Sequence, residues 1–327
     1  MDGKATPGQN PCRGPVAFRV VAFCMVAFWV VVCCIGLLTS GSLYRPCPAM
    51  TTPAPDAQAI AFIGGGNMAS ALIGGLRRQG VDGDLIEVVE PLDEQRQRLQ
   101  TQWGVRTCSQ AHPGLGRAGL VVWAIKPQIF ADAASQTAPH TAQALHLSVA
   151  AGISTDSMAS WLRSQRIVRA MPNTPALIGR GITGLYARPA VSAEERRRIE
   201  LIIGPSGELI WLDQEDRLNA VTALSGSGPA YVFYFLEAMI EAGIGMGLDA
   251  QQARQLALAT FGGAAALAQR SEESPQQLRA RVTSKGGTTF AALSAMEAAG
   301  LKPHFIAAMV AAQERARELG EEFGRSV

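Results

Sequence analysis

Two glycine-containing stretches carry the residue types that could bind ligands and support chemistry. In the first, residues 59–70, an apolar run leads into Gly64, Gly66 and Ala69 with the spacing G-x-G-x-x-A. In this spacing the first glycine permits a tight turn, the second lets the backbone approach a pyrophosphate, and the small third residue lets helix and strand pack closely. Unpaired N–H groups at the start of the following helix favour a bound phosphate. The nucleotide-binding residues predicted here are Gly64, Gly65, Gly66, Asn67 and Met68.

An acidic residue after the next strand supports this interpretation. The apolar residues Ile86, Val88 and Val89 predict that strand, and Glu90 follows them. The dinucleotide fingerprint expects an acid about 20 residues after its glycines, where the carboxylate binds ribose hydroxyls. The context therefore favours a nucleotide site over a glycine-rich loop that merely closes a βα unit.

The second stretch is residues 282–289. Gly286 and Gly287 predict a tight turn, and Thr288 and Thr289 lie at or near a helix start, where N–H groups are unpaired. With the hydroxyl of Ser284, these groups form a small nest suited to a carboxylate or a phosphate. An ordinary N-cap is the alternative, because serine and threonine are common at that position.

The elements that must position these residues alternate between strand and helix up to about residue 213. Further strands are predicted at 105–107, 120–125, 145–149, 167–170, 181–186 and 208–212, with helices at 67–78, 92–103 and 154–162. Such repeats with short connections imply a doubly wound parallel sheet of the Rossmann type. The Gly64 turn, Lys126-Pro127 and residues 171–175 all follow strand ends, so we expect them to line one crevice.

From residue 216 the sequence shows helical periodicity and almost no strand signal. Residues 218–246 are apolar on most faces and are interrupted at 225–229, and further helices are predicted at 250–269, 290–299 and 303–323. A helix that is apolar all round must be buried, which in a region of about 110 residues predicts burial against a second subunit. We therefore expect an atypical leader and linker at 1–57, a Rossmann domain at 58–215 and an all-helical dimerisation and substrate domain at 216–327.

The charge distribution excludes some functions. Residues 1–49 contain four basic residues against Asp2, and the remainder contains 25 basic and 26 acidic residues without a basic block. Nucleic acid is therefore not an expected partner. The four histidines show no ligand spacing with one another or with Cys108, so no metal site is predicted. Because Cys108 is the only cysteine after residue 50, the composition suits a reducing compartment, and we expect a cytoplasmic protein.

The leader contains an uncharged apolar run at residues 20–38. This run is about long enough to span a bilayer, which takes ~20 apolar residues. It could be a membrane anchor, a signal peptide, or an upstream stretch that the mature protein lacks, with Met50 as the true start. We favour the third interpretation because nothing after residue 50 needs a membrane, so membrane association is expected only if the leader is real.

Five motifs together resemble the pyrroline-5-carboxylate reductase family, over about residues 58–325. In chain order they are Gly64-Gly65-Gly66-Asn67-Met68, Ala124-Ile125-Lys126-Pro127-Gln128, Met171-Pro172-Asn173-Thr174-Pro175, Ser225-Gly226-Ser227-Gly228-Pro229-Ala230-Tyr231 and Val282-Thr283-Ser284-Lys285-Gly286-Gly287-Thr288-Thr289. The last two are the specific ones. Lys285 departs from the pattern, since the family often has proline there.

The resemblance implies reduction of L-1-pyrroline-5-carboxylate to L-proline, the last step of proline biosynthesis. It implies a substrate site between the Rossmann domain of one subunit and the helical domain, in intertwined homodimers that often assemble into homodecamers. Ser284 and the N–H groups of Gly287 and Thr288 would hold the substrate carboxylate, and the Thr289 hydroxyl would bind the ring nitrogen. Among cofactor-binding residues, Ala124 belongs to the second motif, and Lys126, Pro127 and Asn173 would border the nicotinamide.

The expected cofactor is NADP(H), with NAD(H) as the alternative. The family commonly prefers NADPH. The Glu90 carboxylate would repel a 2′-phosphate and so favours NADH, whereas Arg96 and Arg98 in the following helix could reach a 2′-phosphate.

Two rival functions remain. A 6-phosphogluconate-type or 3-hydroxyacid dehydrogenase needs a catalytic lysine on a helix of the second domain, but the only lysines after residue 50 are Lys126, Lys285 and Lys302, and none has that setting. A non-catalytic nucleotide sensor tethered to the membrane by residues 20–38 has no need for the pocket predicted at 284–289. Partitioning with membranes would identify such a sensor.

Overall fold

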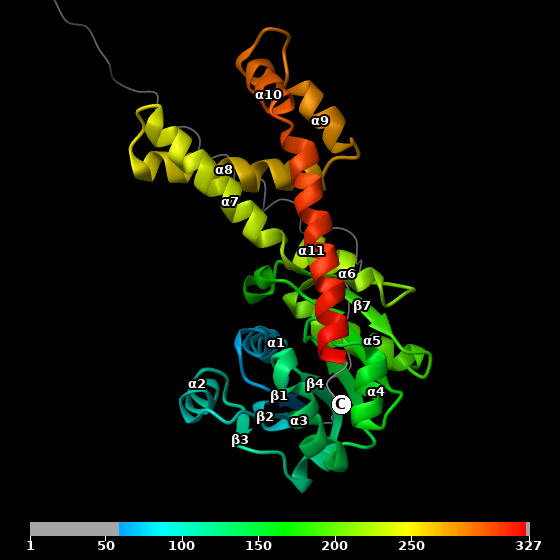
Figure 1. Ribbon diagram of the computed structural model, residues 1–327. Helices are drawn as coiled ribbons and strands as arrows, with labels where there is room; N and C mark the ends of the chain where they lie inside the picture. The colour runs from blue at the N-terminus through cyan, green and yellow to red at the C-terminus, as the bar shows by residue number, and fades with distance from the viewer. Residues whose placement is uncertain (1–58, 325–327) are drawn as a thin grey trace, which may run out of the picture. The chain divides into compact units, whose positions relative to one another are not determined.

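The computed structural model describes residues 59–324, and the leader and the run at 20–38 lie outside this range. Eight strands form one sheet in the order β3-β2-β1-β4-β5-β6-β7-β8 (Figure 1). They are β1 (Ala59–Ile63), β2 (Ile86–Val89), β3 (Arg106–Cys108), β4 (Ala118–Trp123), β5 (Leu145–Ser148), β6 (Ile167–Met171), β7 (Gly181–Ala187) and β8 (Gly207–Trp211).

Strands β1 to β6 are parallel, as predicted. Phe62 of β1 lies opposite Val88 of β2 on one side and Val122 of β4 on the other. Strand β7 runs antiparallel to β6, which corrects the expectation of a wholly parallel sheet. The physical reason is the connection between them. It contains only a short 3-10 turn, η5 (Thr174–Ile178), and a parallel return needs a crossover of about a dozen residues or more.

Helices cover both faces of the sheet, so the doubly wound arrangement is confirmed. Helices α1 (Asn67–Arg78), α2 (Asp93–Trp103) and α5 (Ala193–Ile203) pack on one face, and α3 (Phe130–Thr137) and α4 (Thr155–Leu162) pack on the other. Strand β1 alternates accordingly, with Ile60 and Phe62 in the first core and Ala61 and Ile63 in the second. Helix α3 is absent from the sequence predictions because its buried positions include only one large apolar residue, Phe130.

Short helical turns make several of the connections. They are η1 (Gly83–Leu85), η2 (Pro113–Arg117), η3 (Pro127–Ile129), η4 (Ala138–His140) and η6 (Gly204–Ser206), besides η5.

The region after residue 216 is helical, as expected. It contains α6 (Arg217–Val221), a π-helical turn η7 (Thr222–Gly226), α7 (Gly228–Gly245), α8 (Ala250–Gln269), α9 (Pro275–Arg281), α10 (Thr288–Ala298) and α11 (Leu301–Gly324). The interruption predicted at 225–229 coincides with the end of η7 and the start of α7. Helix α7 packs on α8, and α10 packs on α11.

The end of α11 packs on the second core of the sheet. The Ser157 hydroxyl donates to the Gly324 carbonyl at 3.5 Å, and Phe323 packs against the core that α3 and α4 cover. Much of the helical region is otherwise exposed: no residue of α10 is buried, and Phe233 and Tyr234 of α7 are 58% and 70% exposed. None of the helices in residues 59–324 is both long and apolar enough to cross a membrane.

Candidate active site

The glycine turn after β1 has the tight conformation that its sequence predicts. Gly64 has φ +94°, and its N–H donates to the Val89 carbonyl at 2.9 Å. A Cβ at Gly64 would lie 2.6 Å from the carbonyl oxygen of Ala124. Only glycine fits at this position, because the φ is left-handed and the loop after β4 approaches so closely.

The start of α1 leaves room and donors for an anion. Gly66 is the N-cap residue without a side-chain cap, and the first helical bond runs from Ser70 N–H to the Gly66 carbonyl at 2.9 Å. Within the described chain the N–H groups of Asn67, Met68 and Ala69 therefore have no acceptor. No atom lies within 4 Å of the place where a Cβ at Gly66 would be. This open cradle fits a dinucleotide pyrophosphate.

Glu90 is part of the glycine turn. Its carboxylate accepts one N–H from Gly65 at 2.9 Å and another from Leu92 at 3.0 Å, and the residue is 9% exposed. The Gln95 amide donates to the Gly65 carbonyl from α2. Two side chains thus hold the backbone N–H and carbonyl of Gly65. Gln95 was not predicted, because in the sequence it is one of several polar residues of α2. That Glu90 also binds ribose hydroxyls stays a prediction.

The two arginines considered for a 2′-phosphate differ in their surroundings. The Arg96 guanidinium donates to the Asp93 carboxylate at 2.8 Å and to the Pro91 carbonyl at 2.6 Å. Arg98 is exposed on α2. Of the two, Arg98 has the side chain that is available for a ligand.

The loops after β4 and β6 lie at the same carboxyl edge of the sheet. Ala124 adjoins Gly64, and Lys126 is exposed as the N-cap residue of η3, which starts at Pro127. Asn173 follows β6, and its side-chain oxygen accepts the Ile182 N–H at 3.0 Å. This bond turns the carboxamide so that its nitrogen remains free to donate.

Packing draws these loops together. Turn η5 packs on α1, and the methyl carbon of Met171 lies 2.6 Å from where a Cβ at Gly226 would be. The π-helical turn η7 therefore adjoins the end of β6. Tyr231 reinforces it, since its hydroxyl donates to the Ala223 carbonyl at 3.1 Å. Four of the five sequence motifs thus lie along the carboxyl edge of the sheet.

The fifth motif forms a tight turn that leads into α10. The Gly287 N–H donates to the Ser284 carbonyl at 3.0 Å, and Gly286 has φ +75°, which makes residues 284–287 a type II turn. The first helical bond runs from Ala291 N–H to the Gly287 carbonyl. The N–H groups of Thr288, Thr289 and Phe290 consequently have no acceptor in the described chain, whereas that of Gly287 is used in the turn.

Gly287 also makes room for the Ser284 hydroxyl, because a Cβ there would lie 2.5 Å from Ser284 Oγ. Within residues 59–324 no hydrogen bond or ion pair joins the 282–289 stretch to the glycine turn, and α10 packs on α11. The nucleotide residues are thus grouped together and the substrate residues form a second group.

A cluster with metal-ligand chemistry lies beside β2 and β3. Ligand atoms of Glu87, Cys108 and His112 lie within 4.8 Å of one another. The Glu87 carboxylate already receives Arg117 at 3.0 Å and His112 Nε2 at 3.1 Å, and His112 Nδ1 accepts the Gly114 N–H. Burial raises the pKa of the Cys108 thiol, and the Glu87 carboxylate raises it further. The cluster is therefore explained by the ion pair between Glu87 and Arg117 and by the hydrogen bond between Glu87 and His112.

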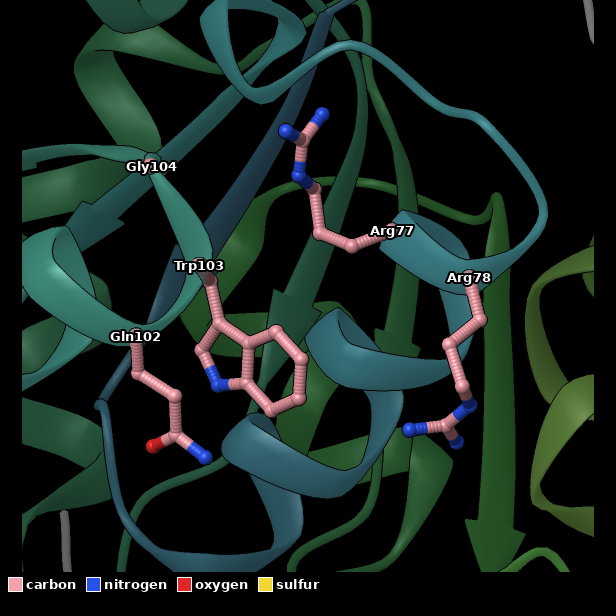
Figure 2. Close-up of a pocket in the computed structure, with 5 residues that line it drawn as sticks. All are labelled: Arg77, Arg78, Gln102, Trp103 and Gly104. Atoms are coloured by element: carbon pink, nitrogen blue, oxygen red, sulfur yellow. The ribbon is translucent and has the colours of Figure 1, made fainter.

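A separate pocket of about 410 Å³ lies where α1 and α2 end (Figure 2). It is lined by Arg77, Arg78, Gln102, Trp103 and Gly104. A Cβ at Gly74 would lie 2.6 Å from the Trp103 ring, so the indole packs directly on α1. The carboxyl ends of these helices lie at the amino edge of the parallel strands, opposite the glycine turn, so this pocket is not part of the nucleotide site.

Family models and relatives of known function match this chain. A model described as pyrroline-5-carboxylate reductase dimerisation matches residues 215–319, and one described as NADP oxidoreductase, coenzyme F420-dependent, matches residues 59–152. The chain is 42% identical over 268 residues to a pyrroline-5-carboxylate reductase of Pseudomonas aeruginosa, covering 81% of this chain and 98% of the relative. It is 41% identical over 266 residues to the Haemophilus influenzae enzyme, with coverages of 80% and 97%.

Solved structures agree with the sequence relatives. A pyrroline-5-carboxylate reductase of Coxiella burnetii has a TM-score of 0.76 at 38% identity, covering 81% of this chain and 99% of that one. Plasmodium falciparum pyrroline carboxylate reductase, solved with NADP bound, has a TM-score of 0.73 at 27% identity, with coverages of 80% and 98%. The chain described here therefore belongs to the pyrroline-5-carboxylate reductase family.

Proposed function

We propose that this chain reduces L-1-pyrroline-5-carboxylate to L-proline with NADPH, as the last step of proline biosynthesis. The observation that carries the proposal is a pair of helix starts built alike. Helices α1 and α10 both begin after a glycine N-cap with no side-chain cap, and neither has an acid in its first turn. Each start offers free N–H groups to an anion, one for the cofactor pyrophosphate and one for the substrate carboxylate.

The residues in the second site have distinct roles in this proposal. The Ser284 hydroxyl and the N–H groups at the start of α10, including that of Thr288, hold the carboxylate, and Gly287 leaves the space that the hydroxyl occupies. Thr289 is the next residue of α10 and is half-buried, and its hydroxyl hydrogen-bonds the ring nitrogen. Lys126, Pro127 and Asn173 border the nicotinamide, and Gly64 to Met68 hold the pyrophosphate.

This arrangement suits reduction of a C=N bond. When bound, NADPH supplies the hydride. The protein holds the imine carbon against the cofactor and binds the ring nitrogen through Thr289, while the nitrogen takes its proton from water. Orientation and proximity therefore provide most of the rate enhancement, and no strong general acid or base is needed in the crevice.

NADPH is the proposed cofactor because the Glu90 carboxylate is engaged by two backbone N–H groups and Arg98 is exposed on the following helix, α2. The hydrogen bonds direct part of the Glu90 charge into the loop, which lessens its repulsion of a 2′-phosphate. NADH is the alternative donor.

The assembly forms part of the same proposal. Two copies pair through helices α7 to α11, so that the 284–289 turn of one subunit meets the nucleotide crevice of the other. The boundary near residue 215 is proposed because the dimerisation family model begins there and the last strand ends at Trp211. Association of dimers into decamers and a cytoplasmic location complete it, and sedimentation and cell fractionation test these two points.

Absorbance at 340 nm tests the activity. The purified chain is mixed with NADPH or NADH, and pyrroline-5-carboxylate is added. We expect rapid substrate-dependent oxidation, faster with NADPH. A folded dimer that binds NADPH and gives no oxidation would refute the reductase. Oxidation of a 3-hydroxyacid by NADP⁺, without reduction of pyrroline-5-carboxylate, would support a 3-hydroxyacid dehydrogenase. NADPH binding by a membrane-bound, inactive chain would support a nucleotide sensor.

A further inference from the structure

Lys285 lies at a position of the substrate turn where the backbone geometry does not require a lysine. Lys285 is the second residue of the type II turn formed by residues 284–287. Proline is favoured at this position because its fixed φ matches the turn. No hydrogen bond in the described chain uses the Lys285 N–H, so the backbone would also accept proline. A lysine at this position lacks the fixed φ of proline. Any contribution that Lys285 makes must therefore come from its side chain.

Lys285 is also a free charge. It is exposed, and within residues 59–324 it forms no ion pair or hydrogen bond. The nearby Arg281 is paired with Glu273 at 2.5 Å, so that carboxylate is already neutralised by another cation. The ammonium of Lys285 is therefore the uncompensated charge of the turn.

We propose that Lys285 is a specificity-determining residue that attracts the substrate carboxylate to the turn, which rests on the proposed function above. Ser284 precedes it directly, and the free N–H groups of Thr288 and Thr289 follow within the same turn and helix start. Because Lys285 is exposed, solvent screens most of the attraction between its ammonium and the carboxylate, and the remainder changes binding about threefold to tenfold. The charge acts on capture of the anion and does not take part in hydride transfer.

The effect should appear in KM and should depend on salt. The attraction acts on bound substrate and transition state alike, so kcat stays unchanged while KM rises when the charge is removed. Screening weakens the attraction, so the KM of the unmodified chain should rise between about 20 mM and about 0.5 M salt more steeply than that of an uncharged variant.

Steady-state kinetics of three variants test the proposal, with NADPH saturating. Lys285→Gln removes the positive charge, and Lys285→Arg keeps it. Lys285→Pro also removes the charge, and proline is favoured at this position of the turn. We expect the KM for pyrroline-5-carboxylate to rise about threefold to tenfold in Lys285→Gln and Lys285→Pro and to stay within about twofold in Lys285→Arg. Lys302→Gln, which removes an exposed lysine at the start of α11, is the matched control and should leave KM unchanged.

A second substrate separates charge from structure. 1-Pyrroline is the same cyclic imine without the carboxylate, and its kcat/KM should be equal in all variants. An unchanged KM in both Lys285→Gln and Lys285→Pro would overturn the proposal. So would an equal loss with 1-pyrroline, or a rise confined to the KM for NADPH. If the unmodified chain fails to reduce pyrroline-5-carboxylate at all, the proposed function itself fails, and that outcome is distinct.

Discussion

The Thr289 hydroxyl is the single side-chain group to which the proposal assigns contact with the reacting C=N bond. It lies in the first turn of α10 and makes no hydrogen bond within residues 59–324, so it is available to a ligand. Valine has nearly the same shape and no hydroxyl. The substitution therefore removes one hydrogen bond and little else.

We expect Thr289→Val to lower kcat/KM for pyrroline-5-carboxylate by about 10- to 100-fold, since a hydrogen bond to a charged group contributes about 1.5–3 kcal/mol. The dissociation constant for NADPH, measured by fluorescence, should not change. Turnover equal to that of the unmodified chain would remove Thr289 from the mechanism.

A buried histidine in the sheet makes stability depend on pH. His146 on β5 is fully buried, and its Nδ1 accepts the Trp123 indole N–H at 3.2 Å. Its Nε2 has no partner among the described residues. Burial, together with the positive charge of Arg166, lowers the pKa of His146 from 6.5 to about 4. The imidazole is therefore neutral in the fold at neutral pH.

The sign of the effect follows from these two pKa values. Between pH 6.5 and pH 4 the unfolded chain binds a proton that the folded chain does not, so this contribution to stability is lost as the pH falls through that window. We expect the free energy of unfolding to fall by up to about 3 kcal/mol. Urea unfolding at several pH values measures it. His146→Asn, which keeps an acceptor for Trp123, should lack this component, and an equal pH dependence in that variant would contradict the assignment.

At the scale of elements, the strand, glycine turn and helix that begin the fold form one unit. Strand β1 fixes Gly64 against the loop after β4, and the Glu90 carboxylate and Gln95 amide hold the peptide of Gly65. Of Gly64, Gly65 and Gly66, only Gly66 has no atom within 4 Å of the place where a Cβ would be. The unit is thus rigid on the protein side and open on the ligand side.

Gly66→Ala should separate binding from folding. Gly66 has φ −68°, which alanine adopts readily, so we expect a stability within about 0.5 kcal/mol of the unmodified chain. The added methyl group occupies the cradle, so the dissociation constant for NADPH should rise at least about tenfold. Calorimetry measures the binding. Gly116→Ala, on the exposed turn η2, is the matched control and should bind NADPH normally, and normal binding by both variants would place the pyrophosphate elsewhere.

The elements differ in how far local sequence could predict them. Strands β1, β2, β4, β5 and β6 follow from apolar runs, because each is largely buried and is rich in apolar residues. Helices α8 and α11 follow from helical periodicity in their sequences. The direction of β7 depends on how few residues η5 provides, and η7 forms a π-helical turn where Gly226 packs against Met171. Neither leaves a periodic signal.

The candidate site shows the same division. The glycine spacing and the paired threonines were visible in the sequence because backbone geometry demands those residue types. The Gln95 contact could not be predicted, because only the fold brings Gln95 to Gly65. The use of the Gly287 N–H within its turn depends on the turn type, which the two glycines alone do not specify.

For the whole molecule, the exposed apolar face of the helices needs a second copy to cover it. Phe233 and Tyr234 are mostly exposed in the single chain, and only Leu236 and Gly243 of α7 are buried. Exposed apolar area of this extent marks an interaction surface. The match of residues 215–319 to a dimerisation family model agrees with this conclusion.

We expect Phe233→Glu to weaken the homodimer by at least about 100-fold in its dissociation constant, because a charge would be buried at the interface. Analytical ultracentrifugation over a dilution series measures the change. Leu201→Glu, on α5 of the Rossmann domain and 49% exposed, should leave the dimer intact. A Phe233→Glu chain that stays dimeric at all concentrations would move the interface to another face.

The proposed sharing of each active site between subunits predicts complementation of two defective chains. Gly66→Ala damages the nucleotide crevice and Thr289→Val damages the substrate turn. In a mixed dimer, one site combines the two damaged parts and the other combines two intact parts. Random mixing makes half of the dimers mixed, so denaturing and refolding an equal mixture should restore about a quarter of full activity. If each site lay within one chain, every site would carry one defect and mixing would restore nothing. Refolding each variant alone controls for recovery unrelated to exchange, and an inactive mixture that contains mixed dimers would require the 284–289 turn to meet the crevice of its own chain.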